Sequence, residues 1–139
     1  YADGYPSDIT RTLAVGEIDD ELRHIWDVVN AANAAARKAV RPGVTGQAVD
    51  RVARDVIEAA GYGEYFIHRT GHGLGLEIHE PPDMSPVNTQ PIAAGNVFTI
   101  EPGIYLPGRG GVRIEDNMLA TADGSRTLTT FTHELITVG

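Results

Sequence analysis

Two histidines, His72 and His79, stand seven positions apart in a stretch that has glycine at 71, 73 and 75. These glycines make a helix unfavourable, since each interior glycine costs roughly 1 kcal/mol relative to alanine. They do allow the backbone to approach a ligand or metal ion closely. Strict strand alternation puts residues seven apart on opposite faces, and a bulge supplied by the glycines could bring both imidazoles to one site. Taken alone, the stretch is equally well explained as a Gly-rich turn with two incidental histidines.

Two glutamates could add carboxylates to these imidazoles. Glu101 and Glu115 lie in β-branched, strand-like surroundings on either side of a Gly-rich turn at 107–111. In a hairpin centred on Gly108 the two glutamates are equidistant from the turn and face each other. Opposed like charges destabilise a strand pair, and a bound cation is the simplest compensation. This pairing is a hypothesis, because a bulge in the turn would shift the register.

The elements that must position these side chains follow from the apolar pattern. Periodic apolar residues predict a helix from Asp19 or Asp20 to about Val40, and a second helix from a Thr45 cap to about Ala60. Strands are predicted at 5–15, 65–68, 97–106, 111–120, 127–130 and 134–138, with a Pro-rich loop at about 80–95. This order predicts an α+β domain with helices on one face of an antiparallel sheet.

The charged residues of the second helix are predicted to form a solvated face. They are Asp50, Arg51, Arg54, Asp55 and Glu58. Trp26 is interpreted as core packing and His24 as a surface residue. His68 is expected to pack beside the site or to support a ligand, and not to bind a metal ion itself.

Composition limits the function classes. The chain has 139 residues, 42% of them hydrophobic, no cysteine and a formal net charge of −8. A chain of this length and hydrophobicity can form the packed core of one ordinary domain at most. Its negative net charge argues against binding to nucleic acid or to an anionic membrane. No apolar run approaches the roughly 20 residues of a membrane span, and no signal-peptide pattern stands out. A cytoplasmic location is expected.

A further segment at 7–12, Ser-Asp-Ile-Thr-Arg-Thr, completes a set of four motifs with those at 69–82, 100–103 and 113–116. Together, and in this order, they resemble the pita-bread metallopeptidases of the M24 type. The resemblance runs from Asp8 to about Val138. It is to the Xaa-Pro branch, prolidase (Xaa-Pro dipeptidase) and aminopeptidase P, because methionine aminopeptidases place their last two glutamates further apart. It implies the pita-bread fold, with a curved antiparallel sheet.

The resemblance implies a dinuclear metal site. The implied ligands are Asp8, His72, Glu101 and Glu115, with Asp8 bridging both ions. A carboxylate-rich set with one imidazole suits divalent ions, of which Mn is expected first, with Co, Zn or Fe as alternatives. Bound ions of this kind activate a bridging water and polarise the scissile carbonyl.

The resemblance also implies catalytic roles. Glu101 is expected to accept a proton in addition to binding metal. His79 is expected to stabilise the tetrahedral intermediate and, with His72, to bind the substrate. Arg113 lies two residues from Glu115, hence on the same strand face, and is expected to orient a carboxylate. The alternative for Arg113 is an ordinary surface ion pair.

The implied reaction is hydrolysis of peptide bonds that precede proline, on peptides with proline at the second position, by a homodimer. The sequence does not separate a dipeptidase from an aminopeptidase. Two other hypotheses remain, a non-catalytic pita-bread binding module and a metal-independent, creatinase-like C–N hydrolase. Metal removal would separate the peptidase from both.

A fifth ligand implied by the resemblance, an aspartate upstream of Asp8, would precede Tyr1. Asp3 is rejected as a substitute, because strand alternation points it away from the face of Asp8. Residues 1–139 are therefore expected to be the C-terminal portion of a catalytic domain whose upstream part is absent, with an incomplete pita-bread fold. Such a chain is expected to bind metal weakly and to hydrolyse peptides slowly or not at all.

Overall fold

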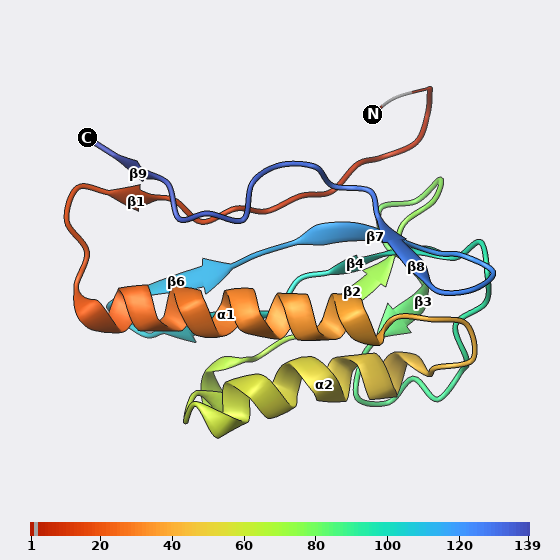
Figure 1. The fold of residues 1–139 in the computed structure, drawn as a ribbon, viewed down its shortest axis with the longest axis horizontal. Coiled ribbons are helices and arrows are strands. Elements are labelled where there is room, and N and C mark those ends of the chain that lie inside the picture. The colour runs from red at the N-terminus through yellow and green to blue at the C-terminus, as the bar shows by residue number, and fades with distance from the viewer. Residues whose placement is uncertain (2) are drawn as a thin grey trace.

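The computed structural model describes residues 1 and 3–139. Two helices, α1 (Asp20–Ala39) and α2 (Gly46–Ala59), lie side by side along one face of the β-structure (Figure 1). A short 3-10 helix spans Gly63–Tyr65. The strands are β1 (Ala14–Val15), β2 (Gly71–Gly73), β3 (Glu80–Met84), β4 (Val97–Ile100), β5 (Gly103–Leu106), β6 (Gly110–Arg113), β7 (Asp116–Ala120), β8 (Ser125–Thr127) and β9 (Thr137–Val138). The predicted α+β arrangement, with helices on one face, is confirmed.

Both helices begin where the sequence predicts. The Asp19 side chain accepts a hydrogen bond from the Leu22 N–H at 2.8 Å, and the Thr45 hydroxyl accepts one from the Ala48 N–H at 3.1 Å. These caps satisfy backbone donors that have no partner within the first turn. The apolar stripes then pack against the sheet in one core, which includes Ile25, Val29, Ala32, Ala36, Val49, Ala53, Ile57, Phe98, Ile100, Ile104, Ile114 and Met118. Within the described residues, neither helix combines the length and apolar character that crossing a membrane requires.

The main sheet has five strands in the order β3-β2-β4-β7-β8, all antiparallel to their neighbours, and β5 pairs with β6 in a separate hairpin. The register predicted from a turn centred on Gly108 is confirmed on both sides of the glutamates. Gly103 pairs with Arg113 in the hairpin, and Ile100 pairs with Asp116 in the main sheet. Glu101 and Glu115 therefore lie opposite each other at the junction between the two ladders.

The ladder is interrupted at that junction, which is why the two predicted long strands each appear as two short ones. The Glu101 N–H donates to the Thr70 carbonyl at 2.7 Å, and the Glu115 N–H donates to the Thr10 carbonyl at 3.0 Å. Each glutamate thus uses its backbone donor on a third segment and not on its hairpin partner. The 7–12 motif and the Gly-rich motif are joined to the glutamates in this way.

The predicted strand at 5–15 is mostly wrong. Only Ala14 and Val15 form a strand, which pairs in parallel with β9 on the side of the sheet away from the helices (Figure 1). Upstream of it, Thr10 makes a single bridge to Glu115. The Thr12 hydroxyl donates to the Arg113 carbonyl at 3.0 Å and accepts from the Arg113 N–H at 3.1 Å. A side-chain hydroxyl therefore takes backbone partners that a regular ladder would use.

Two neighbouring predictions are also wrong. The predicted strand at 65–68 is a 3-10 turn followed by irregular backbone. The predicted loop at 80–95 begins with β3, although that strand contains Pro81 and Pro82. Proline is tolerated there because β3 is the edge of the five-stranded sheet, where missing N–H donors leave no neighbouring strand unpaired. The strand predicted at 127–130 is displaced to Ser125–Thr127 and overlaps the prediction only at Thr127. The strand predicted at 134–138 is shorter, at Thr137–Val138.

The solvated face predicted for the second helix is wrong at Asp50 and Arg54, whose side chains are 1% and 18% exposed and pair with each other. Arg51, Asp55 and Glu58 are exposed, as expected. Asp50 is only 1% exposed, because α2 turns this side chain toward the backbone that leads into β2.

Candidate metal centre

The Gly-rich motif forms β2, the strand that lies between β3 and β4. A Cβ atom on Gly71 would overlap the Thr99 carbonyl oxygen, and one on Gly73 would overlap the Glu80 carbonyl oxygen. Glycine is therefore required at both positions for close packing against the neighbouring strands. Between them, the His72 N–H donates to the Thr99 hydroxyl at 3.1 Å. The glycines thus bring the His72 imidazole close to β4.

The predicted irregularity is present at this motif, but its extra residues lie in β3, because Gly71 pairs with Met84 and Gly73 with Glu80. The antiparallel turn of the chain between β2 and β3 is what brings His79 back beside His72. The register of β2 against β3 shifts between Gly71 and Gly73. The rings of His72 and His79 lie with their centroids 4.2 Å apart in an edge-to-face arrangement. His72 is buried, whereas His79 lies in the exposed end of the 74–79 loop. The two imidazoles therefore share one site, despite their odd spacing in the sequence.

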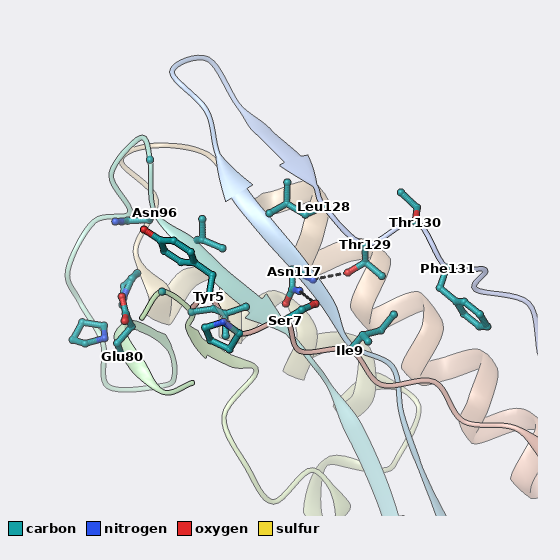
Figure 2. Close-up of a pocket in the computed structure, with 17 residues that line it drawn as sticks. Tyr5, Ser7, Ile9, Glu80, Asn96, Asn117, Leu128, Thr129, Thr130 and Phe131 are labelled. Atoms are coloured by element: carbon teal, nitrogen blue, oxygen red, sulfur yellow. Dashed lines mark hydrogen bonds between the residues drawn. The ribbon is translucent and has the colours of Figure 1, made fainter. Parts of the chain in front are cut away.

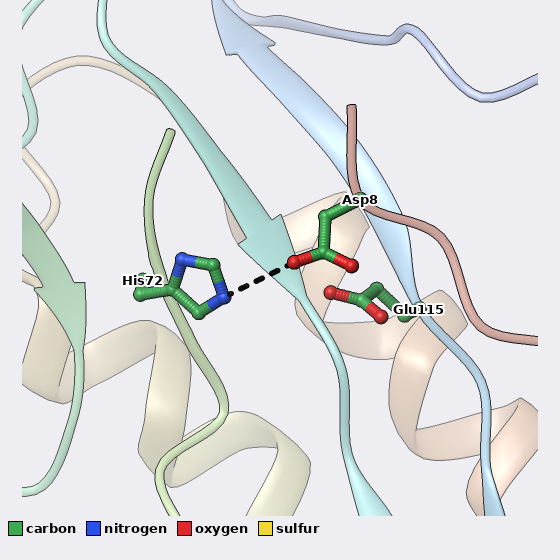
Figure 3. A group of neighbouring side chains, drawn as sticks. All are labelled: Asp8, His72 and Glu115. Atoms are coloured by element: carbon green, nitrogen blue, oxygen red, sulfur yellow. Dashed lines mark ion pairs between the residues drawn. The ribbon is translucent and has the colours of Figure 1, made fainter. Parts of the chain in front are cut away.

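Three segments that are distant in the sequence bring acidic groups to His72. Asp8, His72 and Glu115 each offer one ligand atom, and these atoms all lie within 4.8 Å of one another. Figure 3 shows the three side chains pointing toward a common point from the N-terminal segment, β2 and the residue before β7. Glu101 adds a further carboxylate, with its Oε1 atom 3.3 Å from Nε2 of His72. The four predicted ligand residues thus lie together.

The hydrogen bonds of His72 determine its tautomer. Nδ1 lies 3.0 Å from the Gly73 carbonyl oxygen, and a carbonyl only accepts, so Nδ1 carries a proton. Nε2 faces Oδ2 of Asp8 at 3.8 Å and Oε1 of Glu101 at 3.3 Å. In the neutral ring Nε2 presents a lone pair to two carboxylates, an arrangement that a cation between them would stabilise. Metal-binding histidines commonly have their other ring nitrogen held in this way.

The electrostatics of the glutamates also fit a bound cation. The pKa of Glu115 is raised from 4.5 to about 7, first by burial and then by the nearby charges of Glu101 and Asp8, against the lowering effect of a hydrogen bond from Thr10. Burial likewise raises the pKa of Glu101, against a lowering hydrogen bond from Thr99. Three clustered carboxylates without a compensating cation are electrostatically unfavourable. The donor set, oxygen-rich with one imidazole, therefore fits divalent metal ions.

Two threonines that the sequence reasoning missed hold the glutamates. The Thr10 hydroxyl donates to Oε2 of Glu115 at 2.6 Å, and the Thr99 hydroxyl donates to Oε1 of Glu101 at 3.2 Å. Thr10 lies two residues after Asp8, and Thr99 lies two residues before Glu101. That spacing of two, which puts residues on one strand face, was the available signal.

Arg113 reaches Glu115 through one of these threonines. Its Nε donates to the Thr10 hydroxyl at 3.1 Å, and that hydroxyl donates to Glu115. The predicted role of Arg113 in orienting a carboxylate stays a prediction, with Thr10 as the physical link.

His68 lies beside Tyr105, with its Nε2 atom 2.8 Å from the Tyr105 hydroxyl oxygen. His68 makes packing and hydrogen-bond contacts, as expected.

A second missed group supports the backbone of Glu115. Asp116 is fully buried and accepts hydrogen bonds from Arg11 at 2.7 Å and from His133 at 2.8 Å. Arg11 also donates to the Glu115 carbonyl at 2.7 Å. Burial alone would raise the pKa of Asp116, but the bonds from His133 and Arg11 hold it below its usual value. This network ties the 131–133 segment to Glu115 and the start of β7.

Two cavities adjoin the centre. One of about 720 Å³ is lined by Ser7, Leu74, Asn117 and Phe131, among others, and is shown in Figure 2. A second of about 490 Å³ is lined by Arg69, His79 and residues of β3. None of the four candidate ligands lines either cavity. Ser7, which precedes Asp8 directly, lines the larger cavity, and His79, whose ring lies against that of His72, lines the smaller one. Both volumes fall in the range of small-molecule sites, which is about 300–1,000 Å³.

Solved structures define the class to which this fold and site belong. A dipeptidase from Pyrococcus horikoshii is 54% identical, superposes with a TM-score of 0.95 and is matched over 97% of this chain and 38% of its own. A prolidase from Pyrococcus furiosus is 48% identical, with a TM-score of 0.92, over 94% of this chain and 39% of its own. The fold is the pita-bread fold that these peptidases share.

The sequence comparison leads to the family. The model described as metallopeptidase family M24 matches residues 1–122, and the chain belongs to this family. Among curated relatives, the Xaa-Pro dipeptidase of Lactobacillus helveticus is 51% identical over 127 residues, which are 91% of this chain and 34% of that protein. The chain spans little more than a third of the length of the relatives it matches.

Proposed function

We propose that residues 1–139 form the C-terminal portion of the catalytic domain of a metallopeptidase that hydrolyses peptide bonds preceding proline. The observation that carries this proposal is the convergence of Asp8, His72 and Glu115 in a pita-bread fold, with Glu101 3.3 Å from His72. Membership of the M24 family supports hydrolysis of peptides. The Xaa-Pro preference is supported by relatives that are named Xaa-Pro dipeptidase and prolidase.

The four residues would hold two divalent ions, with Mn as the first expectation. Their oxygen-rich character excludes none of Mn, Co, Fe or Zn, so availability would decide among them. When bound, the ions would activate a bridging water and polarise the carbonyl of the scissile bond. Four donors are fewer than the five that the resemblance implies. Metal binding by this chain alone is therefore proposed to be weak, and its turnover slow or absent.

The remaining roles belong to side chains around the ligands. Glu101, whose pKa is raised by burial, is suited to accept a proton during the reaction. His79 lies at the exposed mouth of the site and lines the cavity of about 490 Å³, where it would donate a hydrogen bond to the developing oxyanion of the substrate. Arg113 would fix Glu115 through the Thr10 hydroxyl. A homodimer and a cytoplasmic location remain predictions.

The test measures Mn²⁺ binding by calorimetry and hydrolysis of Ala-Pro against Ala-Ala. It uses this chain and a longer form that carries the upstream aspartate. We expect the longer form to hydrolyse Ala-Pro preferentially and to lose activity in EDTA. Glu101→Gln should abolish that activity, whereas Glu134→Gln, which changes an exposed carboxylate, should not. Failure of the metal-loaded longer form to cleave Ala-Pro would refute the proposed function. Rapid turnover by the 139-residue chain would refute its proposed weak activity.

A further inference from the structure

Asp50 is a buried carboxylate on α2, outside the ligand cluster. It is 1% exposed and accepts hydrogen bonds from four donors. These are Nε of Arg54 at 2.7 Å, Nη2 of Arg54 at 3.3 Å, the Thr70 N–H at 3.0 Å and the Thr70 hydroxyl at 2.9 Å. A buried charge is tolerated when it is paired and hydrogen-bonded in this way. Asp50 therefore anchors both the backbone and the side chain of Thr70 to the helix.

Arg54 extends the anchor along the chain. Its guanidinium donates to the Phe66 carbonyl at 3.1 Å and to the His68 carbonyl at 2.6 Å. The same group lies over the Phe66 ring, 4.3 Å from its centroid. The segment 66–70 is outside any helix or strand, so these side-chain bonds take the place of a ladder. One ion pair on α2 thereby fixes the path of the chain as it enters β2.

That path leads to two of the candidate ligands. The Thr70 carbonyl accepts the Glu101 N–H at 2.7 Å. Thr70 also stands two residues before His72, and no flexible linker separates them, because Gly71 is packed against the Thr99 carbonyl. A displacement of Thr70 would therefore move the backbone of both Glu101 and His72.

We propose that Asp50 and Arg54 are positioning residues that set the separation of His72 and Glu101 and hence the affinity for metal. This inference rests on the proposed function for its biological meaning, but the quantity that it predicts is the affinity of the chain for metal. A buried ion pair contributes little net stability relative to well-packed apolar side chains of the same size. The geometry that this pair imposes on residues 66–70 is its principal effect.

The experiment compares two matched pairs of variants. Asp50→Asn removes the buried charge, and Asp55→Asn removes an exposed one on the same helix, where Asp55 pairs with Arg51. Thr70→Val removes the hydroxyl that donates to Asp50, and Thr70→Ser retains it. Mn²⁺ affinity is measured by calorimetry at a temperature where circular dichroism shows each variant to be folded, so that a loss of global stability alone does not alter it.

We expect Asp50→Asn and Thr70→Val to weaken Mn²⁺ binding by about 10- to 100-fold, the usual effect of losing a group that supports a metal ligand. Asp55→Asn and Thr70→Ser should bind as the unmodified chain does. If Asp50→Asn does not fold, the Thr70 pair decides. Equal affinity in Thr70→Val and Thr70→Ser would overturn the inference. A chain that binds Mn²⁺ with this dependence, while its longer form fails to cleave Ala-Pro, would contradict the proposed function and leave the inference standing.

Discussion

Replacement of Glu115 by glutamine should stabilise the metal-free chain at alkaline pH. Glu115 is 2% exposed, and burial raises its pKa from 4.5 to about 7. A carboxyl with a higher pKa in the folded than in the unfolded state binds its proton more tightly when folded. Its contribution to stability is therefore fully present below about pH 4.5 and is lost as the pH rises through about 7.

The magnitude follows from that difference. Each pKa unit corresponds to about 1.4 kcal/mol, so ionising Glu115 costs the metal-free fold about 3 kcal/mol above pH 7. Glutamine has nearly the same shape and its amide oxygen can still accept the hydrogen bond from Thr10. Glu115→Gln should therefore raise the free energy of unfolding at pH 8 by up to about 3 kcal/mol and change it little at pH 4.

Urea unfolding in EDTA, followed by the fluorescence of the single tryptophan Trp26, measures this effect. Trp26 packs against the core and reports on loss of the fold. Glu17→Gln is the control, since it neutralises an exposed glutamate away from the cluster. Equal destabilisation by Glu115→Gln at pH 4 and pH 8 would refute the reasoning. So would an effect at pH 8 that matches the Glu17 control.

Two further predictions concern the same centre. Gly71→Ala should lower the free energy of unfolding by roughly 2 kcal/mol or more and weaken Mn²⁺ binding, because the new Cβ overlaps the Thr99 carbonyl. Gly124→Ala, whose Cβ would meet no atom within 4 Å, should change neither quantity in urea unfolding or calorimetry. Mn²⁺ affinity should rise between about pH 5 and pH 7, by up to about tenfold per unit, because binding displaces the proton of Glu115. A flat affinity profile over that range would contradict the raised pKa.

The sequence predicted features that depend on nearby residues. The helix caps predicted at Asp19 and Thr45 are confirmed. They were predictable because each cap side chain accepts a hydrogen bond from an N–H only three residues further along the chain. The strand register predicted across Gly108 is also confirmed. It was predictable because the turn of a hairpin determines which residues lie opposite each other.

Predictions failed where distant segments compete for the same backbone groups. The strand predicted at 65–68 has good local propensity, but Arg54 on α2 takes the carbonyls of Phe66 and His68. The helical pattern placed Asp50 among the solvated charges. In the fold Asp50 is buried instead, and it accepts two hydrogen bonds from Thr70, which is twenty positions away. Periodicity along one helix contains no information about such a partner.

The residue types of the candidate metal centre and the local order of its motifs were therefore determined by the sequence itself. Only the tertiary structure decided that Asp8 and Glu115, 107 positions apart, approach one imidazole closely enough to share an ion. It also decided which hydroxyls hold the glutamates and which helix side chains anchor the strand that carries His72. The physical reason is that caps and turns depend on contacts within a few residues, whereas burial and the separation of ligands depend on how the whole chain packs.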